Sequence, residues 1–283
     1  MNMLKRLSLI GAGFAVLAAA QDAGTPQRIT ATFKDPAAPR KLEVNLLMGN
    51  VTVRGTERAD ALVEYTVRGQ ATKRRAPEPP PPGMHRIGGS GTLDVTEENN
   101  TVRVDGGGLL SNLGDVTIQV PAQTSVTIST SFGAGKIVVE NISGEIEVGN
   151  LAGEVDITNV SGSVVAHTMN GKVVASLSRV TPGKNMSFST FNGDIDVTLP
   201  ADAKANLKAR ADNGEIYTDF DVKLEPQQAS AAPAPAPDAS NSAKRVRAKV
   251  RRRGDGAVTG TINGGGPEIQ FTTFNGRILI HKK

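Results

Sequence analysis

The densest group of chemically active side chains is the basic run Lys244–Arg253, KRVRAKVRRR. If this run forms a strand, four cations lie on its outward face: Arg245, Arg247, Lys249 and Arg251. Alternate residues of a strand lie about 7 Å apart, so the row could bind an anionic polysaccharide or another anionic envelope component. No aromatic residue interleaves to stack on bases, and we expect no nucleic acid. The alternatives are a disordered basic flank or a sheet edge protected by charge.

Acidic residues are the second candidate for chemistry. Glu154, Asp194 and Glu215 would line up into an acidic strip if their strands stack on one side. Such a strip could bind Ca²⁺ or supply a general acid and base to a polysaccharide-cutting enzyme. Outward acids also keep a sheet soluble, and the loop of calcium-binding nonapeptide repeats is missing. We therefore expect no metal site and no catalytic residue, with a carbohydrate-active enzyme as the alternative.

The other reactive residue types form no known catalytic arrangement. The three histidines, His85, His167 and His281, are far apart in the sequence. No Gly-Lys pair has the flanking residues of a phosphate-binding loop, and neither a nucleophile elbow nor a zinc-protease motif occurs. The chain contains no cysteine, which excludes disulfides and thiolate ligands. The sequence predicts a protein that is not an enzyme and needs no cofactor.

The elements that would position these residues are set by a nine-residue repeat. It runs from Gly135 to Leu177, and its glycines are Gly135, Gly144, Gly153, Gly162 and Gly171. Apolar residues occupy the third and fifth places, beginning with Ile137 and Val139, and polar residues separate them. This alternation predicts strands with one buried and one solvated face. A fixed repeat length indicates a solenoid of stacked units.

Later copies of the unit are longer but keep the order strand, Asn-Gly, strand. They lie at residues 186–197, 206–218 and 268–280. Two nine-residue repeats make one coil, so we predict an all-β, right-handed, two-sided β-solenoid with nine-residue half-coils. One side would stack, in sequence order, Ile137, Val155, Val173, Ile195, Ile216 and Ile278. The alternative is an antiparallel β-meander, because Asn-Gly also favours hairpins.

The N-terminus has the features of a secretory signal peptide over residues 1–20. Lys5 and Arg6 precede the apolar stretch Leu7–Leu17, and Ala18–Ala20 resembles a cleavage site. The stretch is shorter than the ~20 residues of a membrane-spanning helix. We therefore expect an exported protein of the periplasm, cell envelope or extracellular space, with no transmembrane segment in the mature chain.

The composition of the chain indicates its domain boundaries and loop insertions. The 283 residues carry a net charge of +4, and 4% are aromatic, which suits a thin aliphatic core. Residues 21–40 read as a flexible lead-in, and residues 41–283 as the solenoid domain. Loop insertions are expected at about 70–90, which is proline-rich, and at 225–243, which is of low complexity and expected to be disordered.

The Gly-x-Ile-x-Val steps, the strand VTIQVP at 116–121 and the Asn-Gly-x-Ile units resemble a bacterial family. It is a domain of unknown function with β-strand repeats, labelled "putative adhesin". The resemblance covers residues 41–280 and implies a secreted or envelope-associated β-solenoid. It brings no catalytic residues. We expect a non-catalytic interaction, adhesin-like or structural role, with a self-assembling envelope scaffold as a further alternative.

Overall fold

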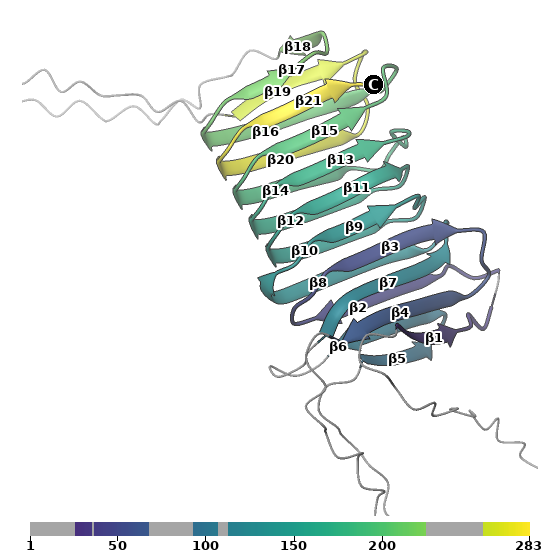
Figure 1. Cartoon of the computed structure of the whole chain (residues 1–283). Coiled ribbons are helices and arrows are strands. Elements are labelled where there is room, and N and C mark those ends of the chain that lie inside the picture. Colours follow the sequence, from purple (N-terminus) through teal and green to yellow (C-terminus); the bar gives the residue numbers. More distant parts are fainter. Residues whose placement is uncertain (1–25, 36, 68–92, 107–112, 225–256) are drawn as a thin grey trace, which may run out of the picture.

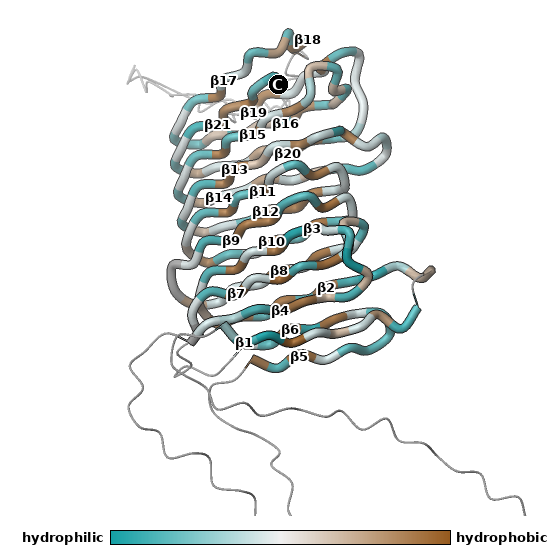
Figure 2. Tube along the Cα trace, turned by 45° about the vertical axis from the view of Figure 1, so that its right-hand side comes forward, coloured by the Kyte–Doolittle hydropathy of each residue, from teal (hydrophilic) through white to brown (hydrophobic). Residues whose placement is uncertain are grey.

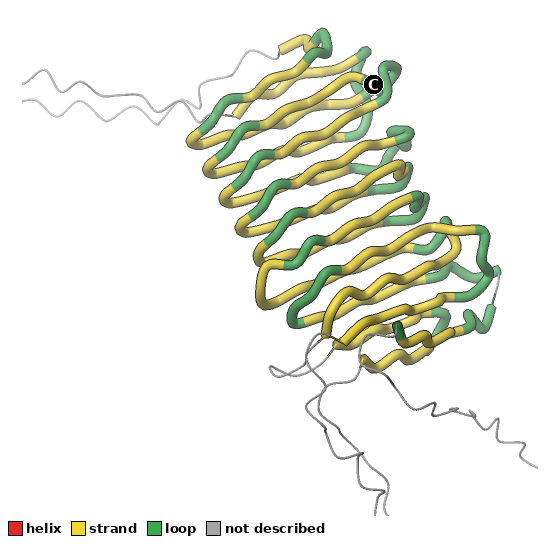
Figure 3. The backbone as a smooth tube through the Cα atoms, viewed as in Figure 1, coloured by secondary structure: helices red, strands yellow, loops and turns green. Residues whose placement is uncertain are grey.

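A computed structural model of the chain describes residues 26–35, 37–67, 93–106, 113–224 and 257–283. Within these ranges the regular structure is entirely β, and no helix could cross a membrane. The strands form two sheets that face each other, and the chain winds from one sheet to the other and back (Figures 1 and 3).

Sheet A, the first of these, has its strands joined side by side over its whole width. Their spatial order is β1 (Gln27–Ala31), β4 (Ala61–Val67), β7 (Leu113–Pro121), β3 (Val51–Thr56), β9 (Ile137–Glu140), β11 (Val155–Val160), β13 (Val173–Leu177), β15 (Ile195–Leu199), β21 (Ile278–Lys282) and β17 (Ile216–Thr218).

Sheet B is the opposite wall of the solenoid. Its strands follow the spatial order β18 (Val222–Leu224), β19 (Ala257–Ile262), β16 (Ala205–Asn213), β20 (Glu268–Asn275), β14 (Met186–Asn192), β12 (Val164–Asn170), β10 (Ile146–Ala152), β8 (Ser125–Ala134), β2 (Lys41–Leu46), β6 (Thr101–Gly106) and β5 (Leu93–Glu98).

The nine-residue repeat builds parallel coils. Ile146 lies beside Val164 in sheet B, and Val155 lies beside Val173 in sheet A, each eighteen positions along the chain. Asn170-Gly171 joins β12 to β13, which belong to opposite sheets, so this Asn-Gly is a solenoid corner and not a hairpin. The two-sided β-solenoid is therefore confirmed, and the antiparallel meander is excluded for these coils.

The core is a double layer of aliphatic side chains between the sheets. Inward residues of the repeat, such as Ile137 and Val155 in sheet A, are fully buried. Sheet B contributes Phe188 and Phe271, whose rings stack with centroids 5.6 Å apart. Figure 2 shows the resulting alternation of hydrophobic and hydrophilic residues along each strand. Because burial of one such side chain contributes about 1.5–3 kcal/mol, the stacked columns stabilise the coils.

Near the C-terminus the coils do not stack in the order of the sequence. The coil β20–β21 lies between β14–β15 and β16–β17, so Ile278 separates Ile195 from Ile216. Our expected column had the right members in the wrong order. The coil β2–β3 is likewise inserted between β6–β7 and β8–β9.

Charge alternation favours the observed position of the C-terminal coil. The residue that precedes each inward column of sheet A changes sign at every coil. From β9 to β17 these residues are Lys136, Glu154, Lys172, Asp194, Arg277 and Glu215. In sequence order Asp194 would lie beside Glu215, and like charges on neighbouring strands repel. Arg277 between them removes that repulsion.

Antiparallel strands close both ends of the solenoid. Strand β4 pairs antiparallel with β7 and with β1, and β19 pairs antiparallel with β16 and β18. Strand β1 and the buried Phe33 lie within residues 21–40, so this part of the expected flexible lead-in is ordered. Its alternating burial against β4 is the reason. The loop insertions expected at 70–90 and 225–243 lie outside the described residues.

Candidate functional site

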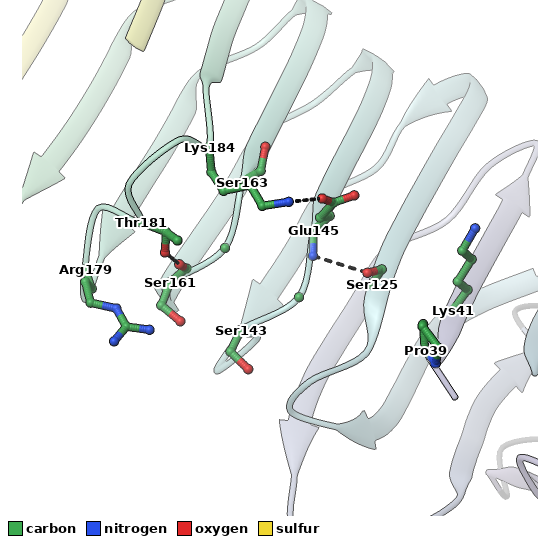
Figure 4. Close-up of a pocket in the computed structure, with 12 residues that line it drawn as sticks. Pro39, Lys41, Ser125, Ser143, Glu145, Ser161, Ser163, Arg179, Thr181 and Lys184 are labelled. Carbon is green, nitrogen blue, oxygen red and sulfur yellow. Dashed lines mark hydrogen bonds and ion pairs between the residues drawn. The ribbon is translucent and has the colours of Figure 1, made fainter. Parts of the chain in front are cut away.

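A groove crosses the corner at which the chain passes from sheet A to sheet B (Figure 4). It encloses about 450 Å³, a size typical of small-ligand sites. Residues from five successive turns line it: Pro39, Lys41, Ser125, Ser143, Gly144, Glu145, Ser161, Gly162, Ser163, Arg179, Thr181 and Lys184.

The floor of the groove is backbone, because glycine occupies the corner of successive coils. A Cβ on Gly162 would lie 1.8 Å from the carbonyl oxygen of Gly144, and one on Gly144 would lie 2.3 Å from that of Thr124. No side chain fits at either position. The nine-residue glycine repeat therefore creates the hollow as well as the tight stacking of the coils.

Hydroxyl groups line the walls, and most are held by the adjacent backbone. Ser143 Oγ donates to the carbonyl of Ala122 at 3.1 Å, and Thr181 Oγ1 donates to the carbonyl of Ser161. Ser125 Oγ accepts from the Glu145 N–H at 3.3 Å. These bonds fix the rotamers, and each hydroxyl oxygen keeps capacity to accept a further hydrogen bond.

Three cations and one carboxylate determine the charge of the groove. Lys184 Nζ lies 2.7 Å from Glu145 Oε1. Neither Lys41 nor Arg179 makes an ion pair with another described residue. Three positive groups and one negative group leave a net charge of +2. The groove thus offers unpaired cations beside hydroxyls, which is the donor set for a carboxylate, sulfate or phosphate group.

The single carboxyl group of the groove is held ionised. The hydrogen bond from Lys184 and the charges of Lys184 and Lys41 lower the pKa of Glu145 below its usual range. A general acid for glycoside hydrolysis needs a raised pKa. The shift at Glu145 is in the opposite direction.

The acidic strip considered from the sequence does not form. Lys172 and Arg277 separate Glu154, Asp194 and Glu215 in the charge row. Arg277 binds Asp194 through its side chain at 2.8 Å and its backbone N–H at 2.7 Å, and both bonds lower the pKa of Asp194. The expectation failed because it overlooked Lys172 on the coil between Glu154 and Asp194, and because it placed β17 directly beside β15.

The remaining predicted residues have no common site. Arg245, Arg247, Lys249 and Arg251 lie outside the described residues, as does His85. The exposed His167 contacts Ser189 in sheet B, and His281 lies 3.5 Å from Asp196 in sheet A. Among the described residues no cluster of His, Asp or Glu side chains could hold a metal ion.

Sequence reasoning missed the cations of the groove. Ser-Gly at the corner of consecutive repeats, Ser143-Gly144 and Ser161-Gly162, was the available signal. Lys41 begins the inserted coil β2–β3, and Arg179 and Lys184 lie in a corner that is longer than the repeat. No fixed spacing connects these three residues, so only the fold brings them together.

A search of curated proteins finds no match. One similar crystal structure is a putative cell adhesion protein from Clostridium sporogenes, with 14% identity over 92% of this chain and 100% of the other, and a TM-score of 0.47. Another is a putative adhesin from Bacteroides fragilis, with 11% identity over 94% and 100% of the chains and a TM-score of 0.28.

The family comparison identifies the middle of the chain. Residues 145–258 match the model of a family of unknown function that is described as Toastrack DUF4097. This range begins at the Glu145 of the groove and includes Arg179 and Lys184. The predicted resemblance to a domain of unknown function with β-strand repeats is confirmed for this segment, which matches Toastrack DUF4097.

Proposed function

We propose that the protein is an exported, non-catalytic interaction protein with an adhesin-like role, and that its groove binds an anionic polysaccharide. The observation that carries the proposal is the pairing state of the groove cations. Lys41 and Arg179 face an open hollow without a carboxylate partner among the described residues. A carboxylate or sulfate group of a glycan would supply that partner.

The shape of the groove favours a polymer. Its lining spans five successive turns of the solenoid, and a second hollow shares Lys41, Ser125, Glu145 and Ser163 with it. Serine hydroxyls from successive coils recur at the coil spacing of about 4.8 Å, close to the length of one sugar unit. No aromatic residue lines either hollow, so stacking of nucleic-acid bases finds no support.

The export part of the proposal rests on the N-terminal sequence, with its two basic residues, apolar stretch and small-residue site. The non-catalytic part is supported by the pairing of acids with cations across the described surface. A carbohydrate-active enzyme would need a pair of carboxyl groups flanking a bond, one of them protonated. The groove offers one ionised carboxylate.

The test is binding of the purified full chain to acidic and neutral polysaccharides at low and high salt. The variant Lys41→Glu/Arg179→Glu reverses the two groove cations that make no ion pair with a described residue, and Arg28→Glu/Arg54→Glu, on the outer face of sheet A, is the charge-matched control outside the groove. We expect the groove variant to lose at least about tenfold in affinity, equal to about 1.4 kcal/mol, and the control to bind within about twofold of wild type. Wild-type binding should weaken with salt.

Two results would contradict this proposal. Equal loss in both variants would mean that overall charge, and not the groove, attracts the glycan. Shortening of the polysaccharide during incubation, measured by size-exclusion chromatography of the glycan, would establish an enzyme in place of a binding protein.

A further inference from the structure

The outer face of sheet B is nearly uncharged over five neighbouring strands, β8, β10, β12, β14 and β20. Its outward residues in the two middle rows are Thr127, Ser129, Glu147, Gly149, Val165, His167, Ser187, Ser189, Gln270 and Thr272. Of these ten residues only Glu147 and His167 are ionisable, and Glu268 at the start of β20 adds one more acid at the edge of the face. The outer face of sheet A is different, because ion pairs such as Arg54–Glu140 and Lys172–Asp196 cross it.

An apolar ridge borders this neutral face along the corner that leads to sheet A. The ridge consists of one exposed side chain from each of the five strands: Phe132, Leu151, Met169, Phe191 and Phe274. Each is 39–57% exposed, and the rings of Phe191 and Phe274 stack with centroids 4.8 Å apart. Exposed contiguous apolar rows of this kind mark interaction surfaces in soluble proteins.

The stacking geometry argues against a sugar ring as the occupant of the ridge. The planes of Phe191 and Phe274 are within 4° of parallel, so each ring covers a face of the other. Met169 follows Phe191 in the ridge on the next strand. The rings therefore present mainly their edges outward, whereas a pyranose stacks on an open aromatic face. A ridge of edges and aliphatic groups suits packing against protein side chains.

Charged strands flank the neutral face with opposite signs at the two ends. Strands β2, β6 and β5 present four outward acids, Glu43, Asp94, Glu98 and Asp105, and two bases, Lys41 and Arg103, a net charge of −2. Strands β16 and β18 present three bases, Lys208, Arg210 and Lys223, and one acid, Asp212, a net charge of +2. When two copies face each other in opposite orientations, the acidic end of each therefore meets the basic end of the other.

We propose that the outer face of sheet B binds a second copy of this chain in antiparallel orientation. The two copies are related by a two-fold axis that lies between their faces and runs along β12. Strand β10 of one copy then opposes β14 of the other, and β8 opposes β20. The acidic end of each copy lies against the basic end of its partner. An interface with a neutral centre, an apolar ridge and a charged rim has the anatomy of stable protein interfaces.

The available area meets the requirement of a stable dimer. Five strands at about 4.8 Å and six residues at about 3.3 Å give the neutral centre roughly 24 Å by 20 Å. The flanking strands extend the contact beyond the about 800 Å² per partner that specific interfaces bury. Sheets also pack face to face in sandwiches with mean strand directions within about 30° of each other. The dimer would be a four-layer stack of two solenoids.

The first test is the molar mass of the purified full chain as a function of concentration, measured by sedimentation velocity. We expect a monomer–dimer equilibrium. Phe191→Lys should weaken dimerisation at least about tenfold, because it places a charge in the ridge on β14, which opposes β10 of the other copy. Tyr217→Lys, at a comparably exposed aromatic residue on β17 of sheet A, outside the proposed interface, should leave the dissociation constant within about twofold. Circular dichroism and thermal unfolding check that both variants fold.

The second test uses the absence of cysteine from the chain. A two-fold axis over β12 places His167 opposite its own copy, and facing sheets lie about 10 Å apart. His167→Cys should therefore form cross-linked dimers with a short bismaleimide. Val174→Cys, on the outer face of sheet A, should remain uncross-linked at the same concentration.

A monomer over the whole concentration range would overturn the proposal. So would a dimer that Phe191→Lys leaves intact, or one that cross-links through Val174→Cys and not through His167→Cys. The glycan proposal is tested separately with its own variants. Lys41 and the second hollow, at Thr127 and Glu147, lie on this same face, whereas Arg179 lines only the groove.

Discussion

Single glycines decide how closely the coils of this solenoid stack. Gly144 and Gly162 lie at one corner of successive coils, where the backbone carbonyl of the preceding coil occupies the place of a Cβ. The same two residues form the floor of the groove. Stability and binding therefore depend on one residue type at this corner.

Replacement of Gly162 by alanine should destabilise the fold. A Cβ 1.8 Å from the Gly144 oxygen forces neighbouring coils apart, and overpacking of this kind costs about 1–3 kcal/mol. The measurement is urea unfolding of the Gly162→Ala variant. Gly149→Ala is the matched control, because its Cβ would meet nothing nearer than 4.0 Å. If both variants unfold at the same urea concentration, close contact at the corner does not limit stability.

At the scale of the element, the alternating charge row selects the neighbour of each coil. Each of Lys172, Asp194 and Arg277 has opposite charges on both sides in the row. Individual exposed ion pairs contribute at most about 1 kcal/mol. A whole row of such pairs disfavours every order of coils that brings like charges together. The row therefore contributes more to the specificity of coil order than to the stability of the fold.

The Asp194–Arg277 pair should make stability depend on pH in a defined direction. Because Arg277 lowers the pKa of Asp194 in the folded state, the pair stabilises the fold above the unfolded pKa of aspartate, about 3.9. That contribution is lost as pH falls through the folded pKa. Wild type should exceed Arg277→Gln in free energy of unfolding at pH 7, and the difference should shrink toward pH 2.

The check on this prediction is urea unfolding of both proteins at a series of pH values. A difference that stays constant from pH 7 to pH 2 would show that Arg277 acts through packing and not through its charge. Arg28→Gln is the control for loss of a surface arginine. It removes an exposed ion pair between Arg28 on the edge strand β1 and Glu64 on β4.

The repeat made the central coils predictable, because period-two alternation and a constant length specify strand, face and register together. The order of the terminal coils was not predictable from columns of Ile and Val, since any of these residues packs equally well against any other. The distinguishing information lay in the outward charges at Asp194, Glu215 and Arg277. The groove was also hidden, because Lys41 and Arg179 are far apart in sequence and lie outside the regular repeat.

At the scale of the whole molecule, the inserted coil β20–β21 connects the cap to the rest of the solenoid. It pairs with β14–β15 on one side and with β16–β17 on the other. Its inward residues Ile269, Phe271, Ile278 and Ile280 are buried. Without it, β17 would lie directly beside β15 and bring Glu215 next to Asp194.

Deletion of residues 264–283 should unfold the C-terminal cap and leave the central coils folded. We expect limited proteolysis with mass spectrometry to yield a resistant fragment that ends near β15, because the columns on β14 and β15 lose their outer neighbour. Deletion of Lys282 and Lys283 alone, which removes one strand-end residue and the chain terminus, is the control and should be as resistant as wild type. A resistant fragment that retains β16–β19 after the larger deletion would show that these strands dock without the inserted coil.

The position of β20–β21 also has a consequence for synthesis. A chain that leaves the ribosome from its N-terminus completes β16 and β17 roughly fifty residues before β20 begins. Until then the coil β14–β15 has an open edge, and its proper neighbour does not yet exist. The last third of the solenoid therefore cannot wind vectorially, one coil after another. Its assembly must wait for the end of translation, when the final sixteen residues insert β20–β21 between two coils that were made earlier.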